Sequence, residues 1–179
     1  MTTAEKPLFH DTELPILTDH IQKISMIGRP LLSQGQVTEP LVICENLWIS
    51  SKIYSAGGER HLHYHPDNDH CFFVLQGTMA VWDGDGNRTD LVAYEGMVVP
   101  ANVAYKFECT STDQNLVILR MAGSAFNYYQ LREKWGRGAV SAEKENEGQG
   151  GEGEFRHEAP SATNAIRPVE SGKYFMVDE

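Results

Sequence analysis

The sequence lacks any apolar stretch long enough to cross a bilayer, since no run approaches the roughly 18 consecutive apolar residues that a spanning helix needs. Its first residues, MTTAEKPLFHDTELP, also lack a basic segment followed by an apolar run and a small-residue cleavage site. No secretion signal is therefore expected. We expect a cytoplasmic protein with no membrane partner.

Positive charge and cysteine are both scarce. The chain has 15 Lys and Arg against 25 Asp and Glu, and its net charge of −10 disfavours binding to nucleic acid or to anionic lipid. The three cysteines, Cys44, Cys71 and Cys109, show no CxxC spacing and lie in or beside apolar runs. This pattern is typical of buried free thiols, so a disulfide scaffold is not expected.

The 179 residues suffice for one domain with tails. Residues 1–38 are a mixed N-terminal arm, in which the apolar spacing from Ile16 to Ile24 predicts a helix over residues 14–27. An arm of this kind packs along its own domain or across a partner subunit. We therefore expect a homodimer.

Residues 39–123 have an all-β pattern. Short apolar runs alternate with Gly, Asn and Asp clusters, which predicts a sandwich or barrel. The run Asp83-Gly84-Asp85-Gly86-Asn87 predicts a hairpin loop, because these residues tolerate positive φ. The expected strands cover residues 41–44, 47–54, 60–65, 70–76, 78–82, 90–94, 97–99, 104–108 and 116–121.

The remainder of the chain divides into three segments. A short helix is predicted within residues 124–136. Residues 137–165 are rich in Glu and Gly with few large apolar side chains, so burial cannot offset their ordering entropy and they should be mobile. Residues 166–179 regain apolar side chains, and either dock onto the barrel or a neighbouring subunit or remain a frayed tail.

Histidine is concentrated in one place. His61, His63 and His65 alternate, which on a strand places three imidazoles on one face, and His70 re-enters a strand after a turn. A lone histidine on a strand is usually a hydrogen-bonded structural residue, but a row of imidazoles is costly to bury without a cation or an acid. The spacing therefore predicts a metal site, with two imidazoles from one strand, a third from the next, and coordination positions left open.

The same stretch resembles the first motif of the cupin superfamily, which runs Gly, five residues, His-x-His, three or four residues, Glu, six residues, Gly. Gly57, His63, His65 and Gly77 match this register, and His70 stands at the Glu position.

A second stretch, EGMVVPANVAYKF, resembles the second cupin motif, which ends in Pro-x-Gly-x-x-His. Gly96, Pro100 and Asn102 fit the framework, and Tyr105 stands where the family has its last histidine. The resemblance covers about residues 41–121. It implies an all-β fold, the double-stranded β-helix or jelly-roll barrel of cupins, with the N-terminal arm and the short C-terminal helix appended.

The resemblance also implies metal ligands. His63 and His65 match the first two ligands, and His70 replaces the usual carboxylate. Three neutral imidazoles keep the full charge of the ion, which favours anionic substrates that chelate it. Tyr105 either completes the shell as a phenolate or acts beside it as an acid or base with a pKa lowered by the cation; we favour the second role.

Two neighbours of the motif have less defined roles. His61 points inward if its strand is regular, as a fourth ligand or a proton shuttle, whereas a twist near Gly57-Gly58 would leave it at the rim. Asp69 has the opposite parity to His70 and should face away from the site.

Cations and aromatic residues also occur in the predicted strands. Lys52 and Arg120 could each hold a substrate carboxylate, but we interpret both as members of exterior salt bridges. Most of the aromatic residues should belong to the core, and some could line a pocket: Trp48, Tyr54, Phe72, Trp82 and Phe107.

Together these features predict a mononuclear non-haem metal enzyme, with Tyr105 and His61 as catalytic residues. Fe(II) is the preferred ion, with Zn(II) or Mn(II) as alternatives. The chain is most similar to cupin dioxygenases that cleave a carbon–carbon bond of a small enolisable or phenolic substrate. Redox-neutral lyases, isomerases or cyclases are the first alternative, and non-catalytic metabolite-binding cupins are the second.

Overall fold

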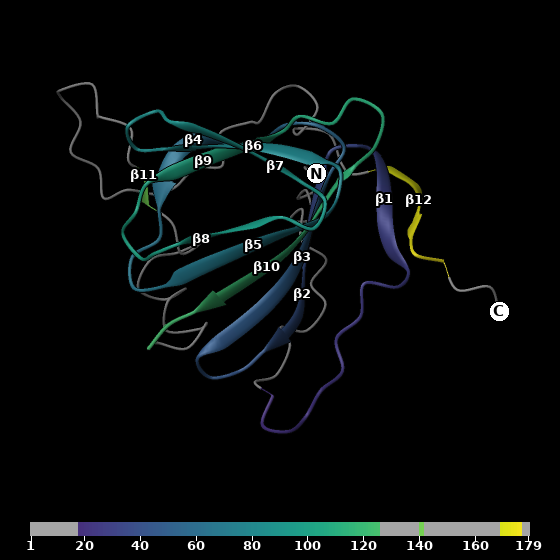
Figure 1. Cartoon of the computed structure of the whole chain (residues 1–179). Helices are drawn as coiled ribbons and strands as arrows, with labels where there is room; N and C mark the ends of the chain where they lie inside the picture. Colours follow the sequence, from purple (N-terminus) through teal and green to yellow (C-terminus); the bar gives the residue numbers. More distant parts are fainter. Residues whose placement is uncertain (1–17, 126–139, 142–168, 177–179) are drawn as a thin grey trace, which may run out of the picture.

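In the computed structural model, residues 18–125, 140–141 and 169–176 are described, and they form antiparallel β-sheets. Two five-stranded sheets face each other, and a two-stranded ribbon lies beside them (Figure 1). The predicted all-β double-stranded β-helix is confirmed. The part of the chain that the structure describes contains no helix with the length and apolar character needed to cross a bilayer.

The two large sheets contain every strand that the sequence predicted between residues 41 and 121. The first has the order β2-β3-β10-β5-β8 and the second the order β11-β4-β9-β6-β7. The first sheet comprises β2 (Gln36–Ile43), β3 (Leu47–Tyr54), β10 (Leu116–Gly123), β5 (Asp69–Gln76) and β8 (Gly96–Val99). The second comprises β11 (Val140–Ser141), β4 (Gly58–Tyr64), β9 (Tyr105–Cys109), β6 (Thr78–Asp83) and β7 (Arg88–Val92).

The main core lies between these sheets. Alternate residues of each strand point inward, as period-2 geometry requires. Tyr54 of β3 and Phe107 of β9 meet edge to face, with ring centroids 5.6 Å apart. The other buried members of this core are Phe72, Val74, Met79, Val81, Leu91, Val99, Tyr105, Leu116 and Ile118.

The outer face of the first sheet is covered by the third, two-stranded sheet. It pairs β1 (Arg29–Gln34) with β12 (Val169–Tyr174), which are far apart in the sequence. Leu32 and Tyr174 pack there against Ile53 and Val117, on the opposite side of β3 and β10 from the main core. Both faces of β3 and β10 are therefore buried over much of their length.

The N-terminal prediction needs correction. Residues 18–27, the described part of the helix predicted over 14–27, are not helical, and residues 29–34 form a strand within the segment interpreted as an arm. Ile21 and Ile27 are exposed, so the apolar side chains that suggested the helix have little to pack against. A short helix gains most of its stability from such packing, and it is absent here for that reason.

Some other predictions fall outside the described residues. The short helix within 124–136 lies there almost entirely, and so does most of the segment 137–165. Residues 140–141 are an exception, since β11 pairs with β4. Within the segment 166–179, residues 169–174 form β12 and pair with β1.

Gly77 turns the chain from the first sheet into the second, between β5 and β6. Its φ is +80°, and a Cβ atom at this position would lie 2.7 Å from the Asn115 carbonyl oxygen. Gly86 in the β6–β7 hairpin has a similar φ of +85°, but a Cβ atom there would meet nothing within 4 Å. Both positions favour glycine, and only Gly77 is also sterically closed.

This difference predicts the effects of two matched substitutions. Gly77→Ala combines backbone strain with a clash against backbone, and should lower the free energy of unfolding by about 3 kcal/mol or more. Gly86→Ala carries only the strain, and should cost about 1–2 kcal/mol. Urea denaturation of both variants measures the difference, and equal losses would contradict the proposed crowding at Gly77.

Candidate functional site

Strands β4, β5 and β9 bring the predicted histidines together inside the barrel. His63 lies on β4, His65 just beyond its end, and His70 at the start of β5. The ring centroids of His63 and His65 are 5.3 Å apart, and those of His65 and His70 are 3.9 Å apart. Tyr105 of β9 joins them, with its ring centroid 4.5 Å from that of His63. The three imidazoles and the phenol therefore form one cluster.

The cluster is largely closed to solvent. His63, His70 and Tyr105 are each at most 2% exposed, while His65 is half-buried. Phe72 lies below the cluster, with its ring centroid 5.6 Å from that of Tyr105. Polar groups in such surroundings need partners inside the protein or a ligand.

His61 occupies an irregular part of β4. The registered pairs are Glu59 with Phe107 and His63 with Tyr105, so four residues of β4 span two of β9. The half-buried His61 lies in this bulge. The backbone carbonyl oxygen of His61 is 2.9 Å from His63 Nδ1. Nδ1 can donate to that carbonyl, and Nε2 is then the nitrogen left for other partners.

Asp69 is exposed, and its carboxylate accepts a hydrogen bond from the Ala101 backbone N–H at 2.9 Å. It faces away from the cluster, as its parity on β5 predicted.

Lys52 and Arg120 correct the sequence interpretation, because neither belongs to an exterior salt bridge. Lys52 is buried and forms an ion pair with Glu59, another buried side chain. It shares the inward face of β3 with Tyr54, and Arg120 shares that of β10 with Ile118. The prior expectation that charged residues lie outside was wrong for both.

Glu59 is the functional candidate that the sequence analysis missed. Its Oε1 pairs with Lys52, and its Oε2 lies 3.3 Å from His63 Nε2. Strand parity could have found it, because residues 59, 61, 63 and 65 alternate on one strand. This chain has His70 at the Glu position of the first cupin motif, and Glu59 supplies a carboxylate nearby, although Lys52 already neutralises it.

The pKa of Glu59 is shifted strongly. Burial alone would raise it, but the attraction of Lys52 and the hydrogen bond and charge of His63 hold the pKa of Glu59 well below its usual range. Burial lowers the pKa of Lys52, and the Glu59 carboxylate opposes that shift. The ionised carboxylate is therefore the stable form at this position.

Two other buried groups are kept neutral. Burial, together with the positive charge of Arg120, holds the pKa of His70 well below its usual range. Burial, with the negative charge of Glu59, raises the pKa of Tyr105 well above its usual range. The protein thus favours a protonated phenol, and any lowering of this pKa would have to come from a bound cation.

The donor set fits a divalent ion in its chemistry. His70 is neutral and keeps a lone pair, and Tyr105 Oη is buried with no hydrogen-bond partner in the described part of the chain. Neutral imidazoles of this kind are common ligands of iron and zinc. As they stand, no three His, Cys, Asp or Glu side chains among the described residues are placed to hold an ion. The fit is therefore one of donor type, and a closed cage would need side-chain adjustment.

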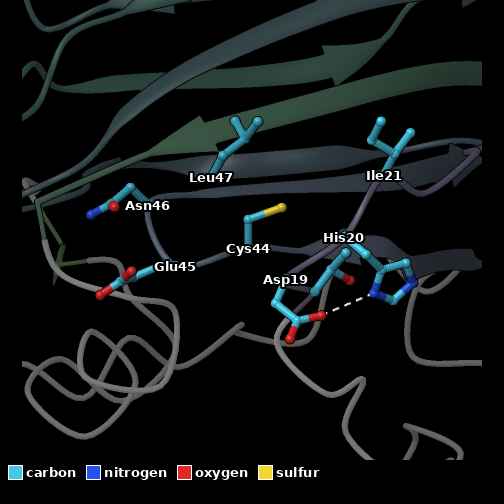
Figure 2. Close-up of a pocket in the computed structure, with 8 residues that line it drawn as sticks. Asp19, His20, Ile21, Cys44, Glu45, Asn46 and Leu47 are labelled. Atoms are coloured by element: carbon cyan, nitrogen blue, oxygen red, sulfur yellow. Dashed lines mark hydrogen bonds and ion pairs between the residues drawn. The ribbon is translucent and has the colours of Figure 1, made fainter.

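A surface depression lies elsewhere on the molecule (Figure 2). It is lined by residues 18–21 and by residues 44–47 of the β2–β3 turn. Asp19 accepts a hydrogen bond from His20 at 3.0 Å there, and both side chains are mostly exposed. This open site brings no buried or strongly perturbed group together.

Fold and site together define a single β-barrel of the double-stranded β-helix type with a polar, histidine-rich interior. Residues 52–121 match the family model of the cupin domain. The barrel is therefore a cupin domain, and the predicted membership of the cupin superfamily is confirmed.

Several solved structures are similar to this chain. They include the cupin domain of Cnp3 from Schizosaccharomyces pombe (15% identity, 57% of this chain and 73% of that chain, TM-score 0.47). KdgF from Halomonas sp. is 16% identical over 50% of this chain and 79% of its own, with a TM-score of 0.46. A cupin superfamily protein from Desulfitobacterium hafniense is 18% identical over 57% of this chain and 99% of its own, with a TM-score of 0.45. These likenesses carry no argument about activity, and no curated protein matches the chain.

The Lys52–Glu59 pair predicts a strong and specific stability effect. Lys52→Met leaves a buried carboxylate without its cation and should lower the free energy of unfolding by about 3–5 kcal/mol. The double variant Lys52→Met, Glu59→Met removes both charges, and should regain most of that loss. Urea denaturation measures all three proteins.

A matched control is Arg88→Met, which breaks an exposed ion pair with Asp90 and should leave the free energy of unfolding almost unchanged. A double variant as unstable as Lys52→Met would contradict the assignment, because the loss would then come from packing and not from an unpaired charge.

Proposed function

We propose that the barrel interior is the active site of a metal-dependent cupin enzyme, with His63, His65 and His70 as the ligands of a divalent ion. The supporting observation is the cluster of three imidazoles and the Tyr105 phenol in a buried part of the barrel. An ion held there would polarise an enol or phenol that chelates it and lower the pKa of that group.

The chain's own residues supply acid–base chemistry next to the ligands. Tyr105 Oη is buried and protonated, so it can donate its proton to a substrate atom at this position. The His61 carbonyl lies 2.9 Å from Nδ1 of His63 and orients the ring. Its other nitrogen, Nε2, lies 3.3 Å from the Glu59 carboxylate, so an ion bound at His63 would have to take the place of that carboxylate. Phe72 and Phe107, both fully buried, keep water from the inner side of the cluster.

Within this class we propose an Fe(II) dioxygenase that cleaves a carbon–carbon bond of a small enolisable or phenolic substrate. Imidazoles that coordinate an ion are neutral ligands and leave its charge uncompensated, which favours an ionised, chelating substrate. The nearby Glu59 carboxylate does not remove this preference, because Lys52 already pairs with it.

A redox-neutral lyase, isomerase or cyclase is the second candidate. The raised pKa of Tyr105 favours it, since a protonated phenol beside the substrate is sufficient for proton transfer without dioxygen. Zn(II) would serve such an enzyme as a Lewis acid.

Elemental analysis tests the proposal directly. Protein purified under anaerobic conditions should contain about one metal ion per chain, with iron in excess over zinc, since the donor set is one that non-haem iron sites use. Zinc with no oxygen consumption on turnover would favour the second candidate. Protein that binds metabolites without any metal, and keeps that binding in His63→Ala, would instead be a non-catalytic binding module.

Substitution of single residues tests the ligand assignment. Loss of a residue that only orients a metal ligand weakens metal binding by about 10- to 100-fold. His70→Ala removes a proposed ligand itself and should weaken binding by more than that. Tyr105→Phe should weaken it less, because the phenol is assigned to proton transfer. Metal titration of the stripped protein measures both, with His20→Ala, which removes an exposed histidine that is not part of the cluster, as control. Equal metal occupancy in wild type and His70→Ala would show that the ligand assignment is wrong.

A further inference from the structure

Arg120 is the one described residue of the barrel interior whose charge no carboxylate balances. Its Nη2 lies 2.8 Å and 3.0 Å from the two ring nitrogens of His70, a side chain that carries no negative charge. Lys52, the other interior cation, already pairs with Glu59. No described carboxylate lies within ion-pair distance of Arg120. Taken together, the Lys52, Glu59 and Arg120 side chains leave one positive charge without an anion.

Two buried polar atoms beside this charge have no hydrogen-bond partner among the described residues. One is Nε of Arg120 itself, and the other is Oγ of Ser50, a side chain only 6% exposed. Ser50 on β3 is the direct cross-strand partner of Arg120 on β10, in a register without irregularities. Paired residues of this kind project to the same face at close range. The two donors therefore lie together on the interior face of the sheet.

Tyr105 Oη is a third buried group without a partner, and it belongs to the same interior. Its ring centroid lies 6.5 Å from that of His70, the ring that Arg120 contacts. A guanidinium N–H and two hydroxyls are all hydrogen-bond donors. Buried donors without partners are costly, so their grouping around an unbalanced cation points to a ligand that is both an anion and a multiple acceptor.

We infer that Ser50 and Arg120 form the subsite that binds the carboxylate of the substrate, next to the imidazole cluster. Arg120 supplies the positive charge and a hydrogen bond from Nε–H to one carboxylate oxygen. The Ser50 hydroxyl donates a second hydrogen bond to either oxygen of the same carboxylate. A monoanion matches the single unbalanced charge, whereas a phosphate dianion would exceed it before any metal is counted. The inference deepens the proposed function, because it assigns a substrate class to the same barrel interior.

The geometry also distinguishes this role from a merely structural one. Both neighbours of Arg120 across the sheet, Ser50 and Phe72, lack a charge that could hold its guanidinium. Strands β3 and β10 lie inside the five-stranded sheet and are hydrogen-bonded to a neighbouring strand on each side, so the backbone that carries Ser50 and Arg120 is held in place. Rigid placement of donors is what specific recognition of a small anion requires.

Calorimetric titration of the full chain stripped of metal tests the subsite without using activity. The probes are acetate, pyruvate and benzoate, with acetamide and benzamide as neutral counterparts and inorganic phosphate as the competing anion. At least one carboxylate should bind saturably. Its amide counterpart, which is neutral, and phosphate, whose charge exceeds that of Arg120, should each bind at least about ten-fold more weakly.

Variants assign that binding to the two residues. Arg120→Met should weaken carboxylate binding by about 30-fold or more, because it removes the one interior charge that no described carboxylate balances. Ser50→Ala should weaken it by about two- to ten-fold, as expected for one neutral hydrogen bond. Arg120→Lys should retain part of the affinity, and Arg88→Met on exposed β7 is the control that should bind like wild type.

Three results would overturn the inference: carboxylate affinity unchanged in both Arg120→Met and Ser50→Ala, amides that bind as tightly as acids, or no binding of any carboxylate. Thermal denaturation shows whether each variant is folded, and Ser50→Ala decides the question if Arg120→Met is not. If carboxylate binding depends on Arg120 but the protein never takes up metal, the proposed metal enzyme is wrong and the subsite stands. If the protein binds one metal ion per chain but no carboxylate, the subsite is wrong and the proposed metal enzyme stands.

Discussion

The interior of this barrel contains ionised groups, and a buried charge is stable only when a partner compensates it. The buried ion pair of Lys52 and Glu59 is the central case. Burial works against both charges, and their mutual attraction is what keeps the carboxylate ionised. Glu59 in turn lies against His63, so the orientation of a candidate metal ligand depends on the pair. The imidazole cluster thus rests on an interaction that has no counterpart in the histidine motif itself.

Electrostatics inside the barrel keep unlike groups in complementary states. Burial and Arg120 keep His70 neutral, and burial and Glu59 keep the proton on Tyr105. A lone-pair donor and a proton donor therefore coexist in one cluster. Such separation of roles between neighbouring titratable groups is the arrangement that acid–base catalysis uses.

The small third sheet matters to the site although it is outside the barrel. By covering Ile53 and Val117 it buries the outer faces of β3 and β10, while Tyr54 and Ile118 bury their inner faces. These are the strands that carry Lys52 and Arg120. Residues of opposite parity on these strands therefore face different apolar neighbours, and Lys52 and Arg120 lie on the side that faces the barrel interior.

Much of the fold followed from local pattern. Alternating apolar residues and Gly, Asn and Asp turns predicted all nine strands between residues 41 and 121, because strand period and turn conformation depend on neighbouring residues. Parity and one short turn likewise predicted that His63, His65 and His70 would converge. The positive φ of Gly77 explains why a glycine ends the first motif.

What the sequence alone determined was therefore which residues alternate and where the chain turns. It did not determine which charged residues contact one another. Lys52 and Arg120 were assigned to the surface because charged residues usually lie there, although their strand parity pointed inward. Glu59 was not recognised as part of the site. Nor did the sequence indicate that residues 29–34 pair with residues 169–174. Only the tertiary structure decided these points, because they depend on contacts between strands far apart in the chain, where burial and the local dielectric set the energy of each charge.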